Sequence, residues 1–331
     1  MLIPSVTGPI DTANLGRTLM HEHIIGVSRS LAYVFPDWLD VDAELGKFKK
    51  CVEHLKPYGL TTLVDGSTIG NGRDIFSTKR AAEMTGINIL VCTGLYWTEF
   101  PWFRYYDDTQ FQTIDEDFLA NLYIRELTQG IQGTDIKAAY VKCATDLFHG
   151  FSPTNVAMIR SCGKAALATG ASVFCHSNSH ARQGLEQQRI LTEEIGVPPH
   201  RVYLGHAFTS GDMEYVEELI KKGSYVGCDQ LGFAMLCPLA TVAKNLAKII
   251  HKDKTYIDHI VLSHDSAMRS DFALALNPKG RTSENPVVGD YHEVFEVLPR
   301  LLEKEGVGQE ELDKMLIDNP RRFFEGRPFE S

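Results

Sequence analysis

Residues 17–23 of the chain read RTLMHEH, a short apolar run that ends in two histidines flanking a glutamate. Runs of this kind recur along the whole sequence. Eight of them are four to nine residues long and rich in Val, Ile, Leu, Thr or Tyr: Arg17–Met20, Thr61–Asp65, Asn88–Tyr96, Ala138–Asp146, Ser172–His176, Arg201–His206, Ser224–Asp229 and His259–Asp265. Continuous apolarity, without alternation, is typical of strands buried on both faces of a parallel sheet.

Segments with helical periodicity lie between these runs. The clearest four are Asp42–Tyr58, Pro153–Thr169, Gly184–Ile195 and Met213–Lys222. Glycines expected to form left-handed helix C-caps close several helices, at Gly59, Gly86, Gly170, Gly196 and Gly223. Strand and helix alternating eight times predict a single (β/α)8 TIM barrel over residues 1–331. A doubly wound open sheet is the competing architecture, but it normally has fewer strands and a glycine-rich first turn, where this chain has HEH.

Composition limits the classes of function. The 331 residues are 44% hydrophobic and 23% charged, as in an ordinary globular protein. A net charge of −10 without a basic cluster argues against a nucleic-acid partner. The polar, proline-containing start does not resemble a signal peptide, and no apolar stretch approaches the ~20 residues that cross a bilayer, so we expect a cytoplasmic protein with no membrane partner. The seven cysteines form no CxxC pair and are expected to be reduced and buried.

Chemically capable side chains gather at the predicted carboxyl ends of the strands, where such a barrel builds its active site. They are four histidines, a lysine and an aspartate: His21, His23, Lys142, His176, His206 and Asp265. The first two histidines are two residues apart in an extended run and therefore face the same side. Imidazole and carboxylate groups are ligands for Zn and other first-row divalent ions. We therefore predict a metal site at the barrel mouth, rather than a hydrogen-bonded polar network that plugs it.

Lys142 is the unusual member of this set. An ammonium group that faces two bound cations is repelled, which favours the neutral amine, and lysine pKa values fall readily in such surroundings. A neutral amine can capture carbon dioxide as a carbamate, whose two oxygens suit a pair of metal ions about 3.5–4 Å apart. Chemistry alone thus leads to the hypothesis that Lys142 is carboxylated (N6-carboxylysine) and bridges two metals.

Five strand-end motifs together resemble the phosphotriesterase family of the amidohydrolase superfamily: LMHEH, VKC, CHSNSH, LGHAF and LSHD. The opening VTGPIDTANLGRTLMHEH and the closing DNPRRFF resemble the two ends of that family, so the resemblance covers nearly the whole chain. The segment GLEQQRIL resembles the phosphotriesterase-like lactonase branch. The resemblance implies a more buried metal held by His21, His23 and Asp265, a more exposed metal held by His176 and His206, and carboxylated Lys142 bridging the two.

The activity that this resemblance implies is the opening of lactones, acyl-homoserine or other γ- and δ-lactones, with weak side activity on organophosphate triesters. A metal-bridging hydroxide would attack the carbonyl, Asp265 would take up its proton, and Tyr96 would approach the metals and the substrate. The metals are expected to be zinc, with Co, Mn or Fe as alternatives. A primary phosphotriesterase (aryldialkylphosphatase) and a carboxylic esterase or amidase on the same metals are the other candidates. The resemblance also implies a homodimer.

Two positions depart from the family pattern. Thr209 stands where an acidic residue usually follows the sixth-strand histidine, and Gln230 stands where the lactonases tend to carry Arg and the phosphotriesterases His. Whether a proton relay or a leaving-group contact runs through these two positions is therefore an open question. We expect Gln230 to contact the substrate together with Tyr96.

Apolar loops follow the third and seventh runs. From them we predict that Trp97 and Phe233 contact the substrate, although aromatic-rich loops suit a dimer interface equally well. A non-catalytic barrel is disfavoured because every ligand position is filled, and a nucleotide enzyme is disfavoured because no glycine-rich phosphate-binding motif is present.

Overall fold

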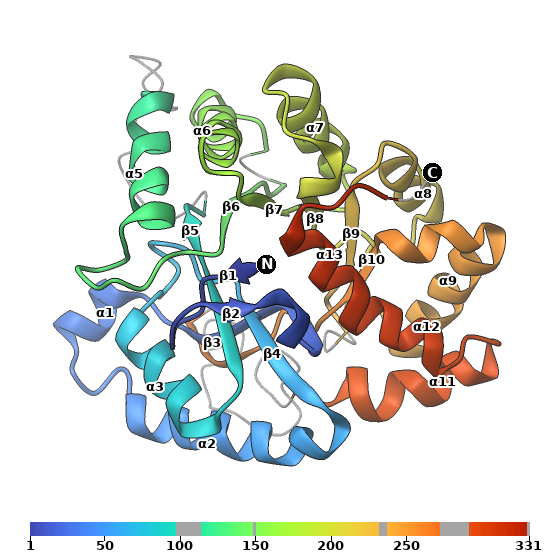
Figure 1. Ribbon diagram of the computed structural model, residues 1–331, viewed down its shortest axis with the longest axis horizontal. Coiled ribbons are helices and arrows are strands. Elements are labelled where there is room, and N and C mark those ends of the chain that lie inside the picture. The colour runs from blue at the N-terminus through green and yellow to red at the C-terminus, as the bar shows by residue number, and fades with distance from the viewer. Residues whose placement is uncertain (97–113, 148–149, 232–236, 272–290, 330–331) are drawn as a thin grey trace.

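A parallel sheet that curves into a barrel, with helices packed around its outside, forms the body of the molecule (Figure 1). The computed structural model describes residues 1–96, 114–147, 150–231, 237–271 and 291–329. The strands follow one another in the order β10-β9-β8-β7-β6-β5-β4-β3-β11. Their bounds are β3 (Arg17–Gly26), β4 (Leu60–Asp65), β5 (Asn88–Gly94), β6 (Tyr140–Ala144), β7 (Ser172–His176), β8 (Val202–Leu204), β9 (Tyr225–Cys228), β10 (Ile260–Leu262) and β11 (Ala267–Ser270). The predicted (β/α)8 barrel is confirmed.

The eighth strand of the barrel is split in two. β10 pairs with β9 on one side, and β11 pairs with β3 on the other. Between the two halves, the backbone of Asp265 adopts a φ of 54°, which interrupts the strand. The N–H of Asp265 donates to the carbonyl oxygen of His21 at 2.9 Å and carries the pairing across the interruption. β10 and β11 together therefore close the barrel, and the prediction of one run ending at Asp265 missed the second half.

Helices follow the strands much as the periodicity predicts. Their bounds are α1 (Arg29–Val34), α2 (Val41–Leu55), α3 (Ile75–Thr85), α5 (Glu116–Thr128), α6 (Pro153–Thr169), α7 (Gln183–Arg189), α8 (Met213–Lys221), α9 (Leu239–Lys252), α11 (Leu298–Lys304), α12 (Gln309–Asp313) and α13 (Asn319–Glu325). Asp or Ser side chains cap the amino ends of α2, α3, α5, α6 and α8, and satisfy backbone N–H groups there. The five glycines predicted at helix ends all have positive φ.

Short 3-10 and π segments extend some of these helices or lie in the connections between elements. They are η1 (Thr12–Asn14), η2 (Lys56–Tyr58), η3 (Ile190–Glu194), η4 (Pro199–Arg201), η5 (Lys254–His259), η6 (Glu293–Val297) and η7 (Lys314–Asp318).

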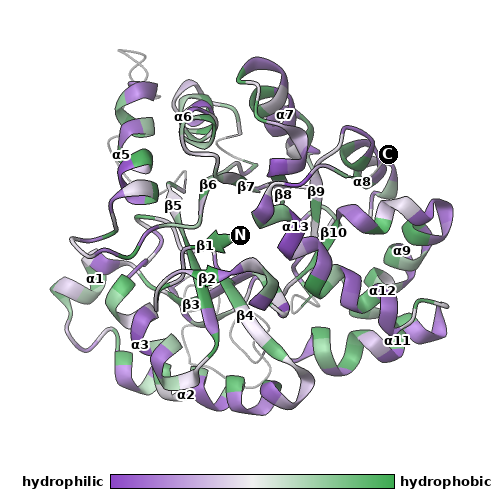
Figure 2. Ribbon diagram, in the orientation of Figure 1, coloured by the Kyte–Doolittle hydropathy of each residue, from purple (hydrophilic) through white to green (hydrophobic). Residues whose placement is uncertain are grey.

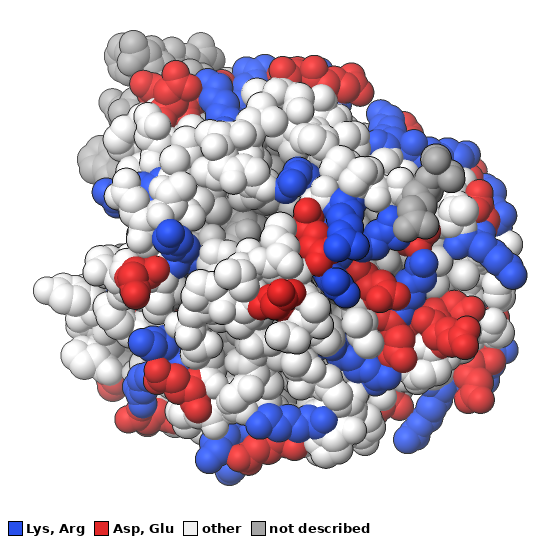
Figure 3. All heavy atoms as spheres, viewed as in Figure 1, with Lys and Arg blue, Asp and Glu red and all other residues white. Residues whose placement is uncertain are grey.

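Figure 2 shows hydrophobic and hydrophilic residues mixed along the helices, as expected where only one face packs on the sheet. In Figure 3, acidic and basic side chains lie interspersed over α9, α11, α12 and α13. Among the described residues, no helix combines the length and the apolarity needed to cross a membrane.

Two hydrophobic cores hold the architecture. The larger core lies between the sheet and the helices, and the smaller one fills the barrel interior. An antiparallel pair, β1 (Leu2–Ile3) and β2 (Ile10–Asp11), joins α13 at the amino end of the barrel, where Ile3, Phe323 and Phe324 enter the interior core. This hairpin lies near the centre of the view in Figure 1. With the amino end filled by apolar side chains, the carboxyl ends of the strands are left for polar chemistry.

A buried ion pair fastens the segment after β4 to α5. Both Nη atoms of Arg73 lie 2.7 Å from oxygens of Glu126, and the Glu126 carboxylate also accepts from the Thr93 hydroxyl at 2.6 Å. Arg73 Nη1 further donates to the carbonyl oxygen of Cys92 at 3.0 Å in β5. These contacts tie a connecting segment on the carboxyl side of the barrel to the barrel wall.

Replacing Arg73 should therefore be costly. We expect Arg73→Met to lower the free energy of unfolding by about 3–5 kcal/mol, because it leaves the Glu126 carboxylate buried without its cation. Arg80→Met is the matched control, since Arg80 pairs with Asp42 at an exposed site and its loss should cost less than about 1 kcal/mol. Urea unfolding followed by circular dichroism measures both. Equal midpoints for the two variants would contradict the prediction.

Candidate metal centre

The predicted ligand residues lie within or directly after five barrel strands. His21 and His23 lie in β3 and Lys142 in β6, whereas His176 ends β7. His206 follows β8, and Asp265 lies between β10 and β11. Both of these last residues have positive φ values, 62° and 54°, which are uncommon outside glycine and frequent at functional sites. The barrel therefore places all six residues at one end.

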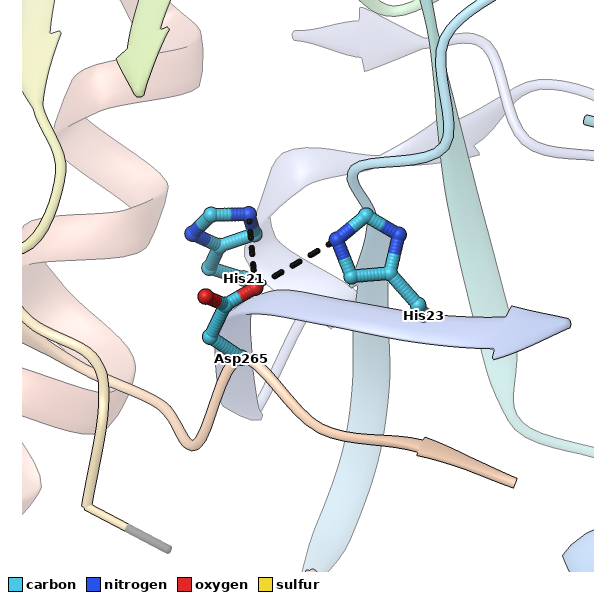
Figure 4. Close-up of side chains that lie close together, drawn as sticks. All are labelled: His21, His23 and Asp265. Atoms are coloured by element: carbon cyan, nitrogen blue, oxygen red, sulfur yellow. Dashed lines mark ion pairs between the residues drawn. The ribbon is translucent and has the colours of Figure 1, made fainter. Parts of the chain in front are cut away.

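His21, His23 and Asp265 form the first part of the cluster (Figure 4). The Nε2 atom of His21 lies 3.3 Å from Oδ1 of Asp265, and Nε2 of His23 lies 3.4 Å from the same oxygen. On its far side, His23 contacts the Ser67 hydroxyl through Nδ1 at 2.9 Å. The donor atoms of the three residues lie within 4.8 Å of one another, which is compact enough to hold one metal ion. The structure thus brings together the residues expected at the more buried metal.

Lys142 points into the same cluster. Its Nζ atom lies 2.9 Å from Nε2 of His21 and 2.9 Å from the carbonyl oxygen of Gly66. The side chain is buried, and burial is the main cause that lowers its pKa. A lowered pKa favours the neutral amine, which is the form that reacts with carbon dioxide. The surroundings are therefore suitable for the carboxylation that the sequence suggested.

His176 and His206 form the second part of the cluster. Nδ1 of His176 lies 2.7 Å from Nε2 of His206, and Nε2 of His206 lies 3.6 Å from Oδ2 of Asp265. The Tyr96 hydroxyl lies 3.1 Å from Nε2 of His176, so Tyr96 reaches the cluster as expected. Trp97 and Phe233, predicted to contact the substrate, lie outside the described residues.

Asp229 is the residue that the sequence reasoning did not assign to the site. Its Oδ2 lies 3.1 Å from Nδ1 of His21, and its Oδ1 lies 3.0 Å from Nδ1 of His206. Oδ1 also accepts the backbone N–H of His206, and the Tyr203 hydroxyl donates to Oδ2. A carboxylate on Nδ1 keeps the proton there and turns the Nε2 lone pair toward the cluster, as is usual for histidine ligands of metals. A carboxylate at the end of the seventh apolar run was the available signal.

Electrostatics agree with a cation-binding role. Burial, followed by the Lys142 charge, lowers the pKa of His21 to about 3, so its imidazole is neutral. Burial also lowers the pKa of His206, but the Asp229 and Asp265 carboxylates outweigh it and raise that pKa overall. Although burial opposes it, the neighbouring histidines hold the pKa of Asp265 well below its usual range. Neutral imidazole and ionised carboxylate are the forms that bind divalent metals, so His21 and Asp265 fit such ions directly, whereas His206, with its raised pKa, releases a proton when a metal binds.

Glu22 supports the cluster from behind. Its buried carboxylate accepts from the Ser263 hydroxyl at 2.7 Å, from N and Nδ1 of His264 at 2.8 Å each, and from the N–H of Ser266 at 3.0 Å. Nε2 of His264 accepts the backbone N–H of Val294, so its ring proton is on Nδ1. These contacts hold residues 263–266, and with them Asp265, against β3.

Gln230 is hydrogen-bonded to Asp265 and to Thr209. Its amide Nε2 lies 3.0 Å from Oδ2 of Asp265, and its Oε1 accepts from the Thr209 hydroxyl at 2.7 Å. The two positions that depart from the family pattern are therefore joined to each other and to a predicted metal ligand. Asp212 caps α8 and pairs with Arg182 at 2.7 Å, which is a structural role.

Comparison with known proteins agrees with this geometry. The sequence model of the phosphotriesterase family matches residues 1–324. A "Phosphotriesterase homology protein" of Mycobacterium tuberculosis is 38% identical over 320 residues, 96% of each chain. An "Aryldialkylphosphatase" of Saccharolobus solfataricus is 32% identical over 326 residues, 98% of this chain and 100% of the relative. The solved structure of the phosphotriesterase from Mycobacterium tuberculosis superposes with a TM-score of 0.88 at 36% identity and covers 98% of both chains.

The position of Asp229 leads to a direct test. We expect Asp229→Asn to weaken metal binding about 10–100-fold, because an amide cannot accept from both imidazole Nδ1–H groups and one ring must turn. Zinc retained after dialysis against graded chelator concentrations measures this. Tyr203→Phe is the control, because it removes one donor to Asp229 and leaves both imidazole contacts in place. Parental zinc retention in Asp229→Asn would contradict the assignment.

Proposed function

The chain belongs to the phosphotriesterase family, and from this premise we propose that it is a two-metal hydrolase that opens lactones. The observation that carries the proposal is the convergence of His21, His23 and Asp265, with Lys142 at 2.9 Å from His21. Family membership supports hydrolysis of ester bonds in general. The choice of two metals and of lactones is our proposal.

The six ligand residues would divide between two sites. His21, His23 and Asp265 would hold the more buried metal, and His176 with His206 the more exposed one. Lys142, once carboxylated, would supply an oxygen to each, since its Nζ already lies inside the cluster. Two bound divalent ions supply a water that ionises near neutral pH and a positive field that polarises the ester carbonyl.

The remaining work falls to side chains of this chain. Asp265 reaches the centre of the cluster with both oxygens, and its carboxylate takes up the proton that water releases as it adds to the carbonyl carbon. Asp229 keeps His21 and His206 in one tautomer throughout, because it holds their Nδ1 protons. The Tyr96 hydroxyl lies beside His176, and we assign to it a hydrogen bond to the ester oxygen of a bound lactone.

A second candidate is a primary phosphotriesterase. It is favoured by the relative from Saccharolobus solfataricus that is called an aryldialkylphosphatase. Attack on phosphorus and attack on a carbonyl develop similar negative charge, so one metal cluster serves both reactions. The substrate is then decided by groups that line the mouth rather than by the ligands.

The deciding measurement is a side-by-side hydrolysis assay on protein of known metal content. Acyl-homoserine lactones, plain γ- and δ-lactones and an aryl phosphotriester are compared by kcat/KM. We expect lactones to lead by several orders of magnitude, with weak triesterase activity. A triester in the lead would replace the proposal by the second candidate. Silence toward every compound with two metals bound would overturn the lactonase proposal and leave the metal centre standing.

Lys142 provides the test of the bridging ligand. We expect Lys142→Ala to lose metal and activity together, with partial recovery of both when a short carboxylic acid such as acetate or propionate is added. Metal analysis and kcat are followed in parallel. Lys47→Ala is the control, because Lys47 pairs with Glu44 on the outer helix α2. Two metals and full activity retained in Lys142→Ala would exclude the bridging role.

A further inference from the structure

The Thr209–Gln230–Asp265 chain of hydrogen bonds is the strongest feature that the proposed mechanism leaves unused. Gln230 Nε2 is 3.0 Å from Asp265 Oδ2, and the Thr209 hydroxyl is 2.7 Å from Gln230 Oε1. All three side chains are partly buried, so the hydrogen bonds are shielded from full solvent competition. This series of hydrogen bonds links the segments that follow three barrel strands, β8, β9 and β10.

The direction of each hydrogen bond follows from the groups involved. An ionised carboxylate can only accept, so the NH2 end of the Gln230 amide must face Asp265. The carbonyl end then faces Thr209, whose hydroxyl supplies a proton to it. With the amide turned the other way, Oε1 would face the Asp265 carboxylate and two acceptors would repel each other. The Asp265 carboxylate thus sets the amide orientation, and the Thr209 hydroxyl satisfies the carbonyl end of the amide in that orientation.

The Asp265 carboxylate needs a contact that prevents its rotation. Its Oδ1 serves both His21 and His23, at 3.3 and 3.4 Å, so a rotation of the carboxylate would disturb two contacts at once. The backbone of Asp265 is fixed by its N–H bond to His21 and by the Glu22 contacts on either side. Those contacts do not restrain the carboxylate. Gln230 holds Oδ2, the opposite corner of the same group.

We propose that Gln230 is a positioning residue that fixes the Asp265 carboxylate toward the metal cluster, and that Thr209 acts only through Gln230. The proposal rests on the proposed two-metal function and extends it to residues outside the ligand set. Asp229 and Gln230, consecutive after β9, then orient ligands from three places, since Asp229 holds His21 and His206. The two residues that depart from the family pattern, Thr209 and Gln230, thus act as a pair. The neutral amide of Gln230 fixes the Asp265 carboxylate, and the Thr209 hydroxyl fixes the amide.

The experiment compares Gln230→Met, Thr209→Val and the double variant. Metal retention against a graded chelator is measured by metal analysis, and kcat and KM are measured on the best substrate of the parent enzyme. We expect Gln230→Met to retain metal about 10–100-fold less well, and kcat to fall while KM changes by less than about twofold. Thr209→Val should weaken retention in the same direction but less, and Thr209→Ser, which keeps the hydroxyl, should fall between Thr209→Val and the parent.

The double variant separates the proposal from two independent effects. If Thr209 acts only through Gln230, the double variant should match Gln230→Met alone, whereas additive losses would overturn that part. Controls are Gln309→Met, which removes an exposed amide–carboxylate contact with Asp313 on α12, and Thr192→Val, which removes a hydroxyl contact with the Gln188 carbonyl. Both should behave as the parent.

The outcomes also distinguish this proposal from the proposed function. A parent protein that binds no divalent metal would overturn both. A parent that binds metal while Gln230→Met retains it equally well would overturn the positioning role alone. A raised KM with unchanged metal retention would likewise reject positioning and return Gln230 to a substrate contact. The metal-retention measurement decides the matter even where no substrate is turned over.

Discussion

The contacts of the buried Glu22 carboxylate hold both the closure of the barrel and the candidate metal centre in place. The carboxylate faces the interruption between β10 and β11 and accepts from four donors there. Without them, burial of the charge would cost several kcal/mol, so the donors and the carboxylate hold one another in a single arrangement. That arrangement brings β11 against β3 and presents Asp265 to the barrel axis. A strand break that would otherwise weaken the sheet therefore becomes the means of aiming a ligand.

The alternation of side chains along β3 lets three consecutive residues serve two purposes. His21 and His23 are two apart and both reach Asp265, whereas Glu22 points to the other face of the strand and reaches Ser263 and His264. A shift of this strand by one residue would exchange the two faces, and would place a carboxylate in the cluster and imidazoles behind it. The register of β3 against β4 and β11 is therefore constrained by these polar contacts as well as by packing.

Patterns local in the sequence predicted the strands, the main helices and the gathering of six candidate ligand residues at one end of the barrel, because buried strands and the polar residues beside them have compositional signals. The parts that were missed depend on partners far apart in the chain. Asp229 gains its role only when His21, 208 residues away, lies opposite it, and Glu22 meets His264 across 242 residues. The second half of the eighth strand is short and only half apolar, and its pairing with the extended β3 makes it a strand. No local pattern carries that information.

Support for the cluster comes from the barrel wall, whereas the mouth is formed by residues at which the loops begin. Side chains such as Asp229 and Glu22 that hold the ligands are fully buried, whereas Tyr96 and Gln230 stand half-buried where the loops begin. Residues at loop starts change more freely than residues in the wall, since fewer neighbours must adjust. Gln230 belongs to both groups, because it begins a loop and yet contacts Asp265. In the two-metal enzyme that we propose, a change at this position would alter both the mouth and the position of the Asp265 carboxylate, and would thereby link the choice of substrate to the metal centre.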